Sequence, residues 1–294
     1  MPQAPDTPWN PPQVTGRQQV WRQVAVGVRA RQWWYFLVLP AAGIAPAQWR
    51  PLHFGTLLDV VHGAAVVAGC LAFAYGVNGL TERHTDLDPR KNPWIGQTPA
   101  KGALELLTGV ALATLAIALT GSVKAMLAAA VSLAAGAVYS LGPRAKRKRL
   151  VGTGLNVLIF APLLLVAPSA VASARSIGWA AAFSALLLQN QLVHEQVDDA
   201  EDRAAGAQST AAWLGPKRTE IALLALGLTA VGAAWLWFAA PVASVLTGTA
   251  LAATGAVLTG RAPLPRRTWQ RGIAAVGGGL AFATEILTAS AGPL

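Results

Sequence analysis

The sequence predicts an all-α, polytopic membrane protein with nine transmembrane helices around a central cavity and a cytoplasmic N-terminus. Of its 294 residues, 54% are hydrophobic and only 12% are charged, and the mean hydropathy is +0.45. Uncharged apolar runs recur along the whole chain. Most of them approach the roughly 20 residues that a helix needs to cross a bilayer.

Nine apolar runs predict the transmembrane helices. They cover residues 33–47, 54–80, 102–119, 126–141, 151–167, 177–193, 221–239, 242–259 and 272–287. The first run is short and opens with Trp33, Trp34 and Tyr35, a group typical of a membrane interface. We expect residues 1–32 to form an N-terminal tail and an interfacial helix, because arginines are mixed there with apolar residues. Residues 33–294 are expected to form one membrane domain.

The lysine and arginine residues separate cleanly between the two sides of this arrangement. With the N-terminus inside and nine alternating helices, 20 of the 23 lie in inner segments. The outer segments hold only Arg50, Lys124 and Arg175. Since cytoplasmic loops of membrane proteins are enriched in lysine and arginine, this separation supports nine spans. It predicts a multi-pass protein of the cell membrane.

Composition also argues against other classes of protein. Cys70 is the only cysteine, which excludes an intramolecular disulfide and, with scattered histidines, argues against a structural zinc site. The net charge of +10 and the basic run at 144–149 would suit a nucleic-acid-binding protein. Because basic residues crowd the inner loops of membrane proteins, we interpret the run as a topology signal and expect no nucleic-acid partner.

An acidic stretch follows the sixth apolar run. Five carboxylates lie within eight positions: Glu195, Asp198, Asp199, Glu201 and Asp202. In a helix Asp198 and Asp202 share one face, where like charges repel by a few tenths of a kcal/mol. A bound divalent cation would offset that repulsion.

A second acidic stretch follows the second apolar run. Asn78, Glu82 and Asp86 are spaced by four residues, again one helical face. The two stretches together hold eight of the 13 acidic residues of the chain, and both fall on the inner side of the predicted topology. We therefore expect their side chains to converge on one cavity.

These residue types suit the binding of a phosphorylated lipid. Mg²⁺ prefers oxygen ligands and binds through one or two carboxylates together with substrate phosphates. Basic residues on the same side are expected to complete a diphosphate clamp; they are Arg90, Lys91, Arg144, Lys146 and Arg203. The tail of a lipid-soluble diphosphate would lie among the apolar helices. This combination predicts cleavage of a polyprenyl diphosphate at the membrane.

The first acidic stretch carries a family resemblance. The sequence resembles the UbiA family of intramembrane prenyltransferases, whose first motif has the form Asn-Asp-x-x-Asp-x-x-x-Asp after the second span. Asn78, Glu82 and Asp86 match this motif, with Gly79 and Glu82 as departures from it. The following DPRKNP run, residues 88–93, is similar to the family's continuation.

The second acidic stretch extends the resemblance. The family's second motif, Asp-x-x-x-Asp after the sixth span, is matched by Asp198 and Asp202. Residues 202–215 are similar to the menaquinone branch, and Tyr139 beside the basic loop also resembles a family feature. The nine expected spans fit the family as well.

The resemblance implies Mg²⁺-dependent transfer of a prenyl group from a polyprenyl diphosphate to a lipophilic acceptor within the membrane. It implies that Asn78, Asp86, Asp198 and Asp202 are catalytic and, with Glu82, hold the metal or the diphosphate. We expect Lys91, Tyr139, Arg144, Lys146 and Arg203 to bind substrate, with Arg29 and Arg31 within reach of the diphosphate. Glu195 and His194, one turn before Asp198 and Asp199, are expected to position the acceptor or accept its proton.

Several functions remain compatible with these residues. The acceptor is an aromatic ring such as a quinone precursor, or a polyene. A terpene cyclase of the same family would act on the prenyl diphosphate without an acceptor. A transporter or a lipid-binding protein would bind the phosphorylated lipid without cleaving it. Acidic clusters at helix ends on one side favour the enzyme, because transporters typically place broken helices near the midplane.

Overall fold

The computed structural model describes most of the chain. It describes residues 27–49, 54–84, 86, 92, 94–95, 102–141, 145, 148–204, 206, 208–259 and 263–290. Within these ranges it describes only the backbone of residues 31, 200–204, 263–264 and 290. Most of residues 1–32 lies outside the described part, so the division into a tail with an interfacial helix and a membrane domain stays a prediction.

The described chain is helical throughout, apart from two isolated β-bridges. The longer helices are α3 (Phe54–Glu82), α4 (Ala103–Gly121), α5 (Val123–Ser140), α6 (Arg149–Phe160), α7 (Ala174–Ala204), α8 (Thr210–Trp237), α9 (Ala240–Thr259) and α10 (Pro263–Ser290). The 3₁₀-helix η5 (Ala161–Leu165) continues α6. In the described part of the chain, six helices are long and apolar enough to cross a membrane: α3, α4, α5, α8, α9 and α10. The prediction of an all-α polytopic membrane protein is confirmed.

Eight of the nine predicted runs correspond in order to α3 through α10. The first helix, expected over residues 33–47, is shorter in the structure and runs over Trp34–Gly43. It consists of η2 (Trp34–Val38) and α2 (Leu39–Gly43), with η1 (Ala30–Gln32) before it and η3 (Pro46–Trp49) after it. Pro40 lies in the first turn of α2, where a missing amide is tolerated, so the segment breaks only after Gly43, where Ile44 is extended.

Close backbone packing explains the glycine at position 43, next to this break. A Cβ added at Gly43 would collide with the backbone carbonyl of Leu164 in η5. The amide of Val171 also donates to the carbonyl of Gly43 at 3.2 Å. The broken segment therefore packs backbone against backbone on the loop before α7, which a larger side chain would prevent.

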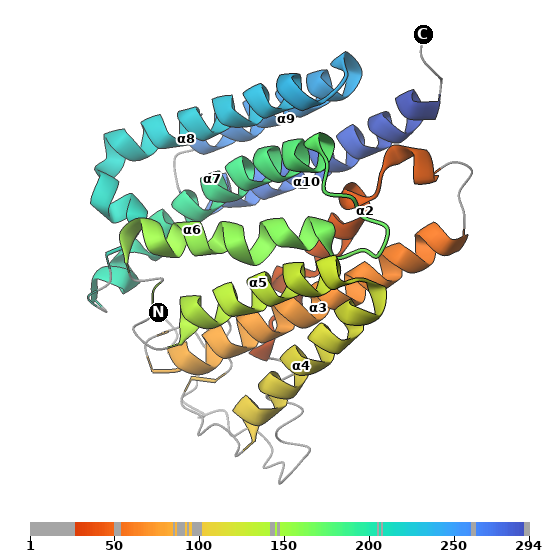
Figure 1. Ribbon diagram of the computed structural model, residues 1–294. Coiled ribbons are helices and arrows are strands. Elements are labelled where there is room, and N and C mark those ends of the chain that lie inside the picture. The colour runs from red at the N-terminus through yellow and green to blue at the C-terminus, as the bar shows by residue number, and fades with distance from the viewer. Residues whose placement is uncertain are drawn as a thin grey trace, which may run out of the picture.

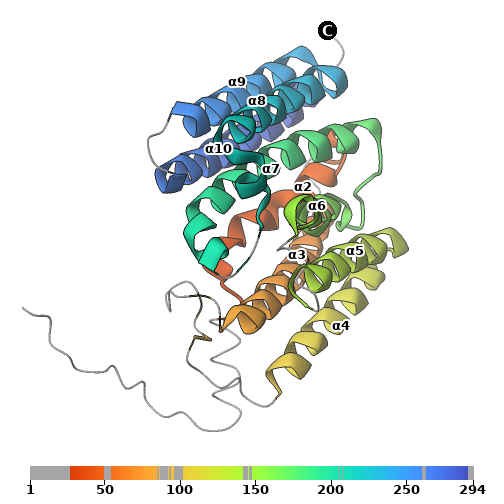
Figure 2. The same ribbon diagram turned by 90° about the vertical axis from the view of Figure 1, so that its left-hand side faces the viewer.

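The helices lie in two groups around a central layer. Figures 1 and 2 show α3, α4 and α5 together on one side, α8, α9 and α10 together on the other, and α2, α6 and α7 between them. Small residues permit close helix contacts: Gly69 faces Thr114 across α3 and α4, and Gly227 faces Thr254 across α8 and α9. The C-terminal ends of α3 and α7 lie toward the same end of the bundle, at the left of Figure 1.

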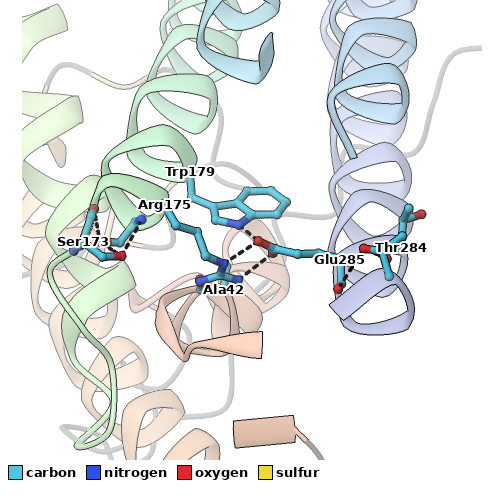
Figure 3. A network of polar contacts seen from close by, with 8 residues as sticks. Ala42, Ser173, Arg175, Trp179, Thr284 and Glu285 are labelled. Atoms are coloured by element: carbon cyan, nitrogen blue, oxygen red, sulfur yellow. Dashed lines mark hydrogen bonds and ion pairs between the residues drawn. The ribbon is translucent and has the colours of Figure 1, made fainter. Parts of the chain in front are cut away.

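A buried ion pair closes the opposite end (Figure 3). Glu285 of α10 accepts two hydrogen bonds from the guanidinium of Arg175 in α7, one of them at 2.6 Å, and a third from the indole of Trp179 at 3.1 Å. Arg175 also donates to the carbonyl of Ala42 in α2 at 2.8 Å. One guanidinium thus joins three segments that are far apart in the sequence.

Candidate functional site

The first acidic motif lies on the last turns of α3. Asn78 and Glu82 belong to the helix, and the amide of Asp86 donates to the carbonyl of Glu82 at 2.9 Å, the four-residue spacing of a helical bond. This bond holds the backbone of Asp86 against the last turn of α3, and the helix itself ends at Glu82. The side-chain amide of Asn78 also donates to the carboxylate of Glu82.

Two other elements meet this motif. The hydroxyl of Ser140, the last residue of α5, donates to the side-chain oxygen of Asn78 at 3.3 Å. Tyr139, expected to bind substrate, is the preceding residue of α5 and is partly buried against the core. The end of α5 therefore lies beside the first motif, and the binding role of Tyr139 stays a prediction.

Asp86 is held by a cation and an amide. Arg29 forms a salt bridge with its carboxylate at 3.4 Å, and the side chain of Asn92 donates to the same oxygen at 2.8 Å. Burial lowers the pKa of the Arg29 guanidinium, and the neighbouring Asp86 carboxylate opposes that shift. Because both partners of Asp86 are buried, its negative charge is fixed in position and partly neutralised.

Gly79, the first departure from the family motif, has a packing explanation. A Cβ there would lie 3.2 Å from Cδ1 of the Trp94 indole and 3.5 Å from the guanidinium of Arg29. Gly27 lies against the same indole, and Trp94 is 1% exposed. The indole thus fills the space that a larger residue would need at position 79.

The second acidic motif lies on α7, with Asp198 one turn after His194. His194 Nδ1 lies 3.3 Å from the Asp198 carboxylate. Asn190, a further turn back on the same face, donates to the side chain of Gln270 in α10 at 2.9 Å. This face of α7 therefore points toward α10. Asp202 continues the four-residue spacing, but only its backbone is described.

The two motifs lie near the C-terminal ends of α3 and α7. These helix ends lie toward the same end of the bundle in Figure 1. The motifs therefore approach the same end of the bundle, which faces the viewer in Figure 2. The expectation that they share one end agrees with this geometry.

Glu195 has a buried position with several donors. It is 9% exposed and accepts hydrogen bonds from Thr153 of α6 at 3.0 Å and from the backbone amide of Ala211, in the first turn of α8, at 2.9 Å. Gln191 donates to it as well, at 3.2 Å. Both oxygens thus serve the junction of three helices, the packing role of a buried carboxylate. The predicted contact with an acceptor stays untested.

Several predicted residues lie outside the described part. Lys91, Arg144 and Lys146 are not described, and for Asp202 and Arg203 only the backbone is. Among the described side chains no group of three or more histidines, cysteines and carboxylates is gathered around one point. The oxygen-rich set of Asn78, Glu82, Asp86 and Asp198 nevertheless has the chemistry that Mg²⁺ prefers.

Comparison with known proteins identifies the fold. The sequence profile of the UbiA prenyltransferase family matches residues 29–286. The chain belongs to the UbiA prenyltransferase family. No curated protein sequence matches this UbiA-family chain.

Solved structures of UbiA homologues resemble this family member over nearly their whole length. One is a UbiA homologue from Archaeoglobus fulgidus bound to DMAPP and Mg²⁺, 21% identical, with 90% of this chain and 99% of that chain covered and a TM-score of 0.70. The same homologue bound to GPP and Mg²⁺ gives a TM-score of 0.69 at 21% identity, with 90% and 99% covered. A digeranylgeranylglyceryl phosphate synthase is 12% identical, with 92% and 98% covered and a TM-score of 0.69.

The sequence alone does not single out three residues of this candidate site of the UbiA-family chain: Asn92, Arg267 and Arg271. Asn92 lies outside the described helices, so no helical period marks it. The signal for the arginines was their spacing of four at the start of an apolar helix, which places both on one face.

Proposed function

We propose that the protein transfers a prenyl group, in an Mg²⁺-dependent reaction, from a polyprenyl diphosphate to a lipophilic acceptor within the cell membrane. The observation that carries the proposal is the meeting of two acidic motifs at one end of a bundle with the fold of a prenyltransferase family. The relatives bound to DMAPP or GPP with Mg²⁺ support the donor class and the metal.

The polar end supplies the diphosphate site in this proposal. Mg²⁺ would be held by the motif residues Asn78, Glu82, Asp86, Asp198 and Asp202. When bound, it would neutralise the charge that develops on the leaving diphosphate. Arg29 and Asn92 hold the Asp86 carboxylate in place before any ligand binds. Such fixed charges need little reorganisation during the reaction, which is the main source of electrostatic catalysis.

An aromatic group beside the polar end supplies the site of the prenyl chain. The Tyr35 and Phe36 rings lie 4.4 Å apart, and Phe36 lies 4.5 Å from Phe160 and 6.1 Å from Phe183. Ring faces attract cations, so this group suits an allylic cation formed when the diphosphate leaves. It also excludes water, which would otherwise capture the cation.

Release of pyrophosphate from geranylgeranyl diphosphate tests the proposal. We expect release by the full-length protein with Mg²⁺ and none after chelation. Asp86→Ala and Asp198→Ala are each expected to lower the rate at least about a hundredfold, the scale of losing a positioned charge. Asp59→Ala, at the other end of α3, is the matched control. Full turnover in both motif variants contradicts the proposal, and binding without release identifies a lipid binder instead.

A further inference from the structure

Two arginines of α10 lie outside both acidic motifs and share one face of the helix. Arg267 and Arg271 are four residues apart, hence on one face of the helix. Gln270 between them donates to the carbonyl of Leu186 at 2.9 Å and accepts from Asn190, both in α7. These two bonds fix the position of α10 against the helix that carries Asp198.

An aromatic residue positions the Arg271 guanidinium. Arg271 donates to the hydroxyl of Tyr35 and stacks over the same ring, 5.5 Å from its centre. The contacts Arg175–Glu285 and Asn190–Gln270 make α7 and α10 antiparallel, so Arg267 lies toward the end of α7 that carries Asp198. The pair therefore lies between η2 and α7, on the side of the second motif.

The Asp198 carboxylate offsets part of the positive charge at Arg267. Neither arginine forms a salt bridge with a described carboxylate. Nε of Arg267 is buried and has no hydrogen-bond partner among the described residues. The two cations repel each other, and buried, unpaired donors cost free energy. An anion between them removes both costs.

We propose that Arg267, Arg271 and Tyr35 form a binding subsite for an oxyanion group of a substrate, beside Asp198 and separate from the two acidic motifs. Guanidinium groups match the geometry of carboxylates and phosphates with paired donors, and the Tyr35 hydroxyl adds a further polar contact. The anion is either the diphosphate of the donor or a carboxylate or phosphate on the acceptor. The naming of the donor and the acceptor as the sources of the anion rests on the proposed function.

Binding measurements on the full-length protein in lipid nanodiscs test the subsite. The donor probe is geranyl thiodiphosphate with Mg²⁺, which resists cleavage. The acceptor probes are 4-hydroxybenzoate and its uncharged counterpart phenol, added at saturating donor probe. The doubly substituted R267Q/R271Q protein is expected to bind one of the two anionic probes at least about tenfold more weakly, as for loss of charged hydrogen bonds.

The pattern of loss identifies the source of the anion. Weaker binding of the thiodiphosphate assigns the subsite to the donor, and weaker binding of 4-hydroxybenzoate alone, with phenol unchanged, assigns it to the acceptor. Arg271→Lys is expected to keep part of the affinity, because it keeps the charge. Arg218→Gln, which removes an exposed cation of α8, is the matched control and should change nothing.

Unchanged binding of both anionic probes by the folded R267Q/R271Q protein would overturn the proposal, as would a parent protein that binds neither. Thermal unfolding of each variant establishes that it is folded. The measurement is independent of turnover. A protein that binds the probes through these arginines but releases no pyrophosphate would retain the subsite and lose the proposed function.

Discussion

The side chain of Asn92 donates one hydrogen bond to the carboxylate of Asp86 at 2.8 Å and another to the backbone carbonyl of Gly79 at 2.9 Å. Its oxygen accepts from the amide of Trp94 at 3.1 Å. Asn92 is fully buried. A single amide group thus connects a motif carboxylate to the helix end behind it.

Removal of this amide should loosen the first motif. In Asn92→Ala the carbonyl of Gly79 loses a partner, and Arg29 is the described side chain that still holds the Asp86 carboxylate. We expect the free energy of unfolding to fall by about 1–3 kcal/mol, as for unsatisfied buried groups, and the Mg²⁺ concentration for half-maximal pyrophosphate release to rise. Thermal unfolding and a Mg²⁺ titration measure the two effects. An unaltered Mg²⁺ requirement would show that Asn92 does not position Asp86.

The packing of Trp94 against Gly79 predicts that a change from glycine to alanine affects the melting temperature differently at two positions in apolar helices. Alanine normally stabilises a helix interior by about 1 kcal/mol relative to glycine. Gly109→Ala in α4 has open space around its new Cβ and should raise the melting temperature. Gly79→Ala must displace the indole of Trp94. Its melting temperature should therefore stay unchanged or fall. Equal stabilisation at both positions would refute this explanation of the motif departure.

Glu195 is predicted to stabilise the junction of α6, α7 and α8. Glu195→Ala leaves the donors of Thr153 and Ala211 without their acceptor, so the free energy of unfolding should fall by about 1–3 kcal/mol. Glu195→Gln keeps an acceptor oxygen and should lose less. Thermal unfolding of both variants makes the comparison. Loss of pyrophosphate release without loss of stability in Glu195→Ala would instead favour the acceptor-binding role expected from the sequence.

The ion pair at the other end of the bundle predicts a strong stability effect. Arg175→Met leaves the carboxylate of Glu285 largely buried without its cation, which typically costs about 3–5 kcal/mol. The double substitution Arg175→Met with Glu285→Leu removes the stranded charge and should recover much of that loss. A double-mutant cycle of unfolding free energies measures the coupling. Additive effects of the two substitutions on the free energy of unfolding would contradict a coupling between Arg175 and Glu285.

The sequence predicted the bundle because each long helix is a nearly continuous apolar run. It also predicted that Asn78 and Glu82 share one face of a helix, because residues four apart lie on the same side. Asp86 follows the end of that helix, and its amide bonds to the carbonyl of Glu82. Composition did not reveal the break within residues 33–47. That segment is apolar, and its break follows Gly43, whose backbone packs against the carbonyl of Leu164.

Contacts between distant segments were beyond sequence reasoning. Glu195 reads as part of an acidic cluster, but its partners come from α6 and α8. Arg267 reads as a charge of an inner loop, yet the bonds of Gln270 to Asn190 and Leu186 place this part of α10 against the helix that carries Asp198. Such placements depend on how helices are rotated against each other, which one sequence does not encode in any local pattern.

The central claim is that both acidic motifs hold one diphosphate at the same end of the bundle. An experimental structure of the full-length protein with Mg²⁺ and geranyl thiodiphosphate tests it most directly. We predict that the diphosphate lies between the first motif, at the end of α3, and Asp198 of α7, with Mg²⁺ bridging it to carboxylates of both motifs. A diphosphate bound elsewhere, or held by only one of the two motifs, would contradict the claim.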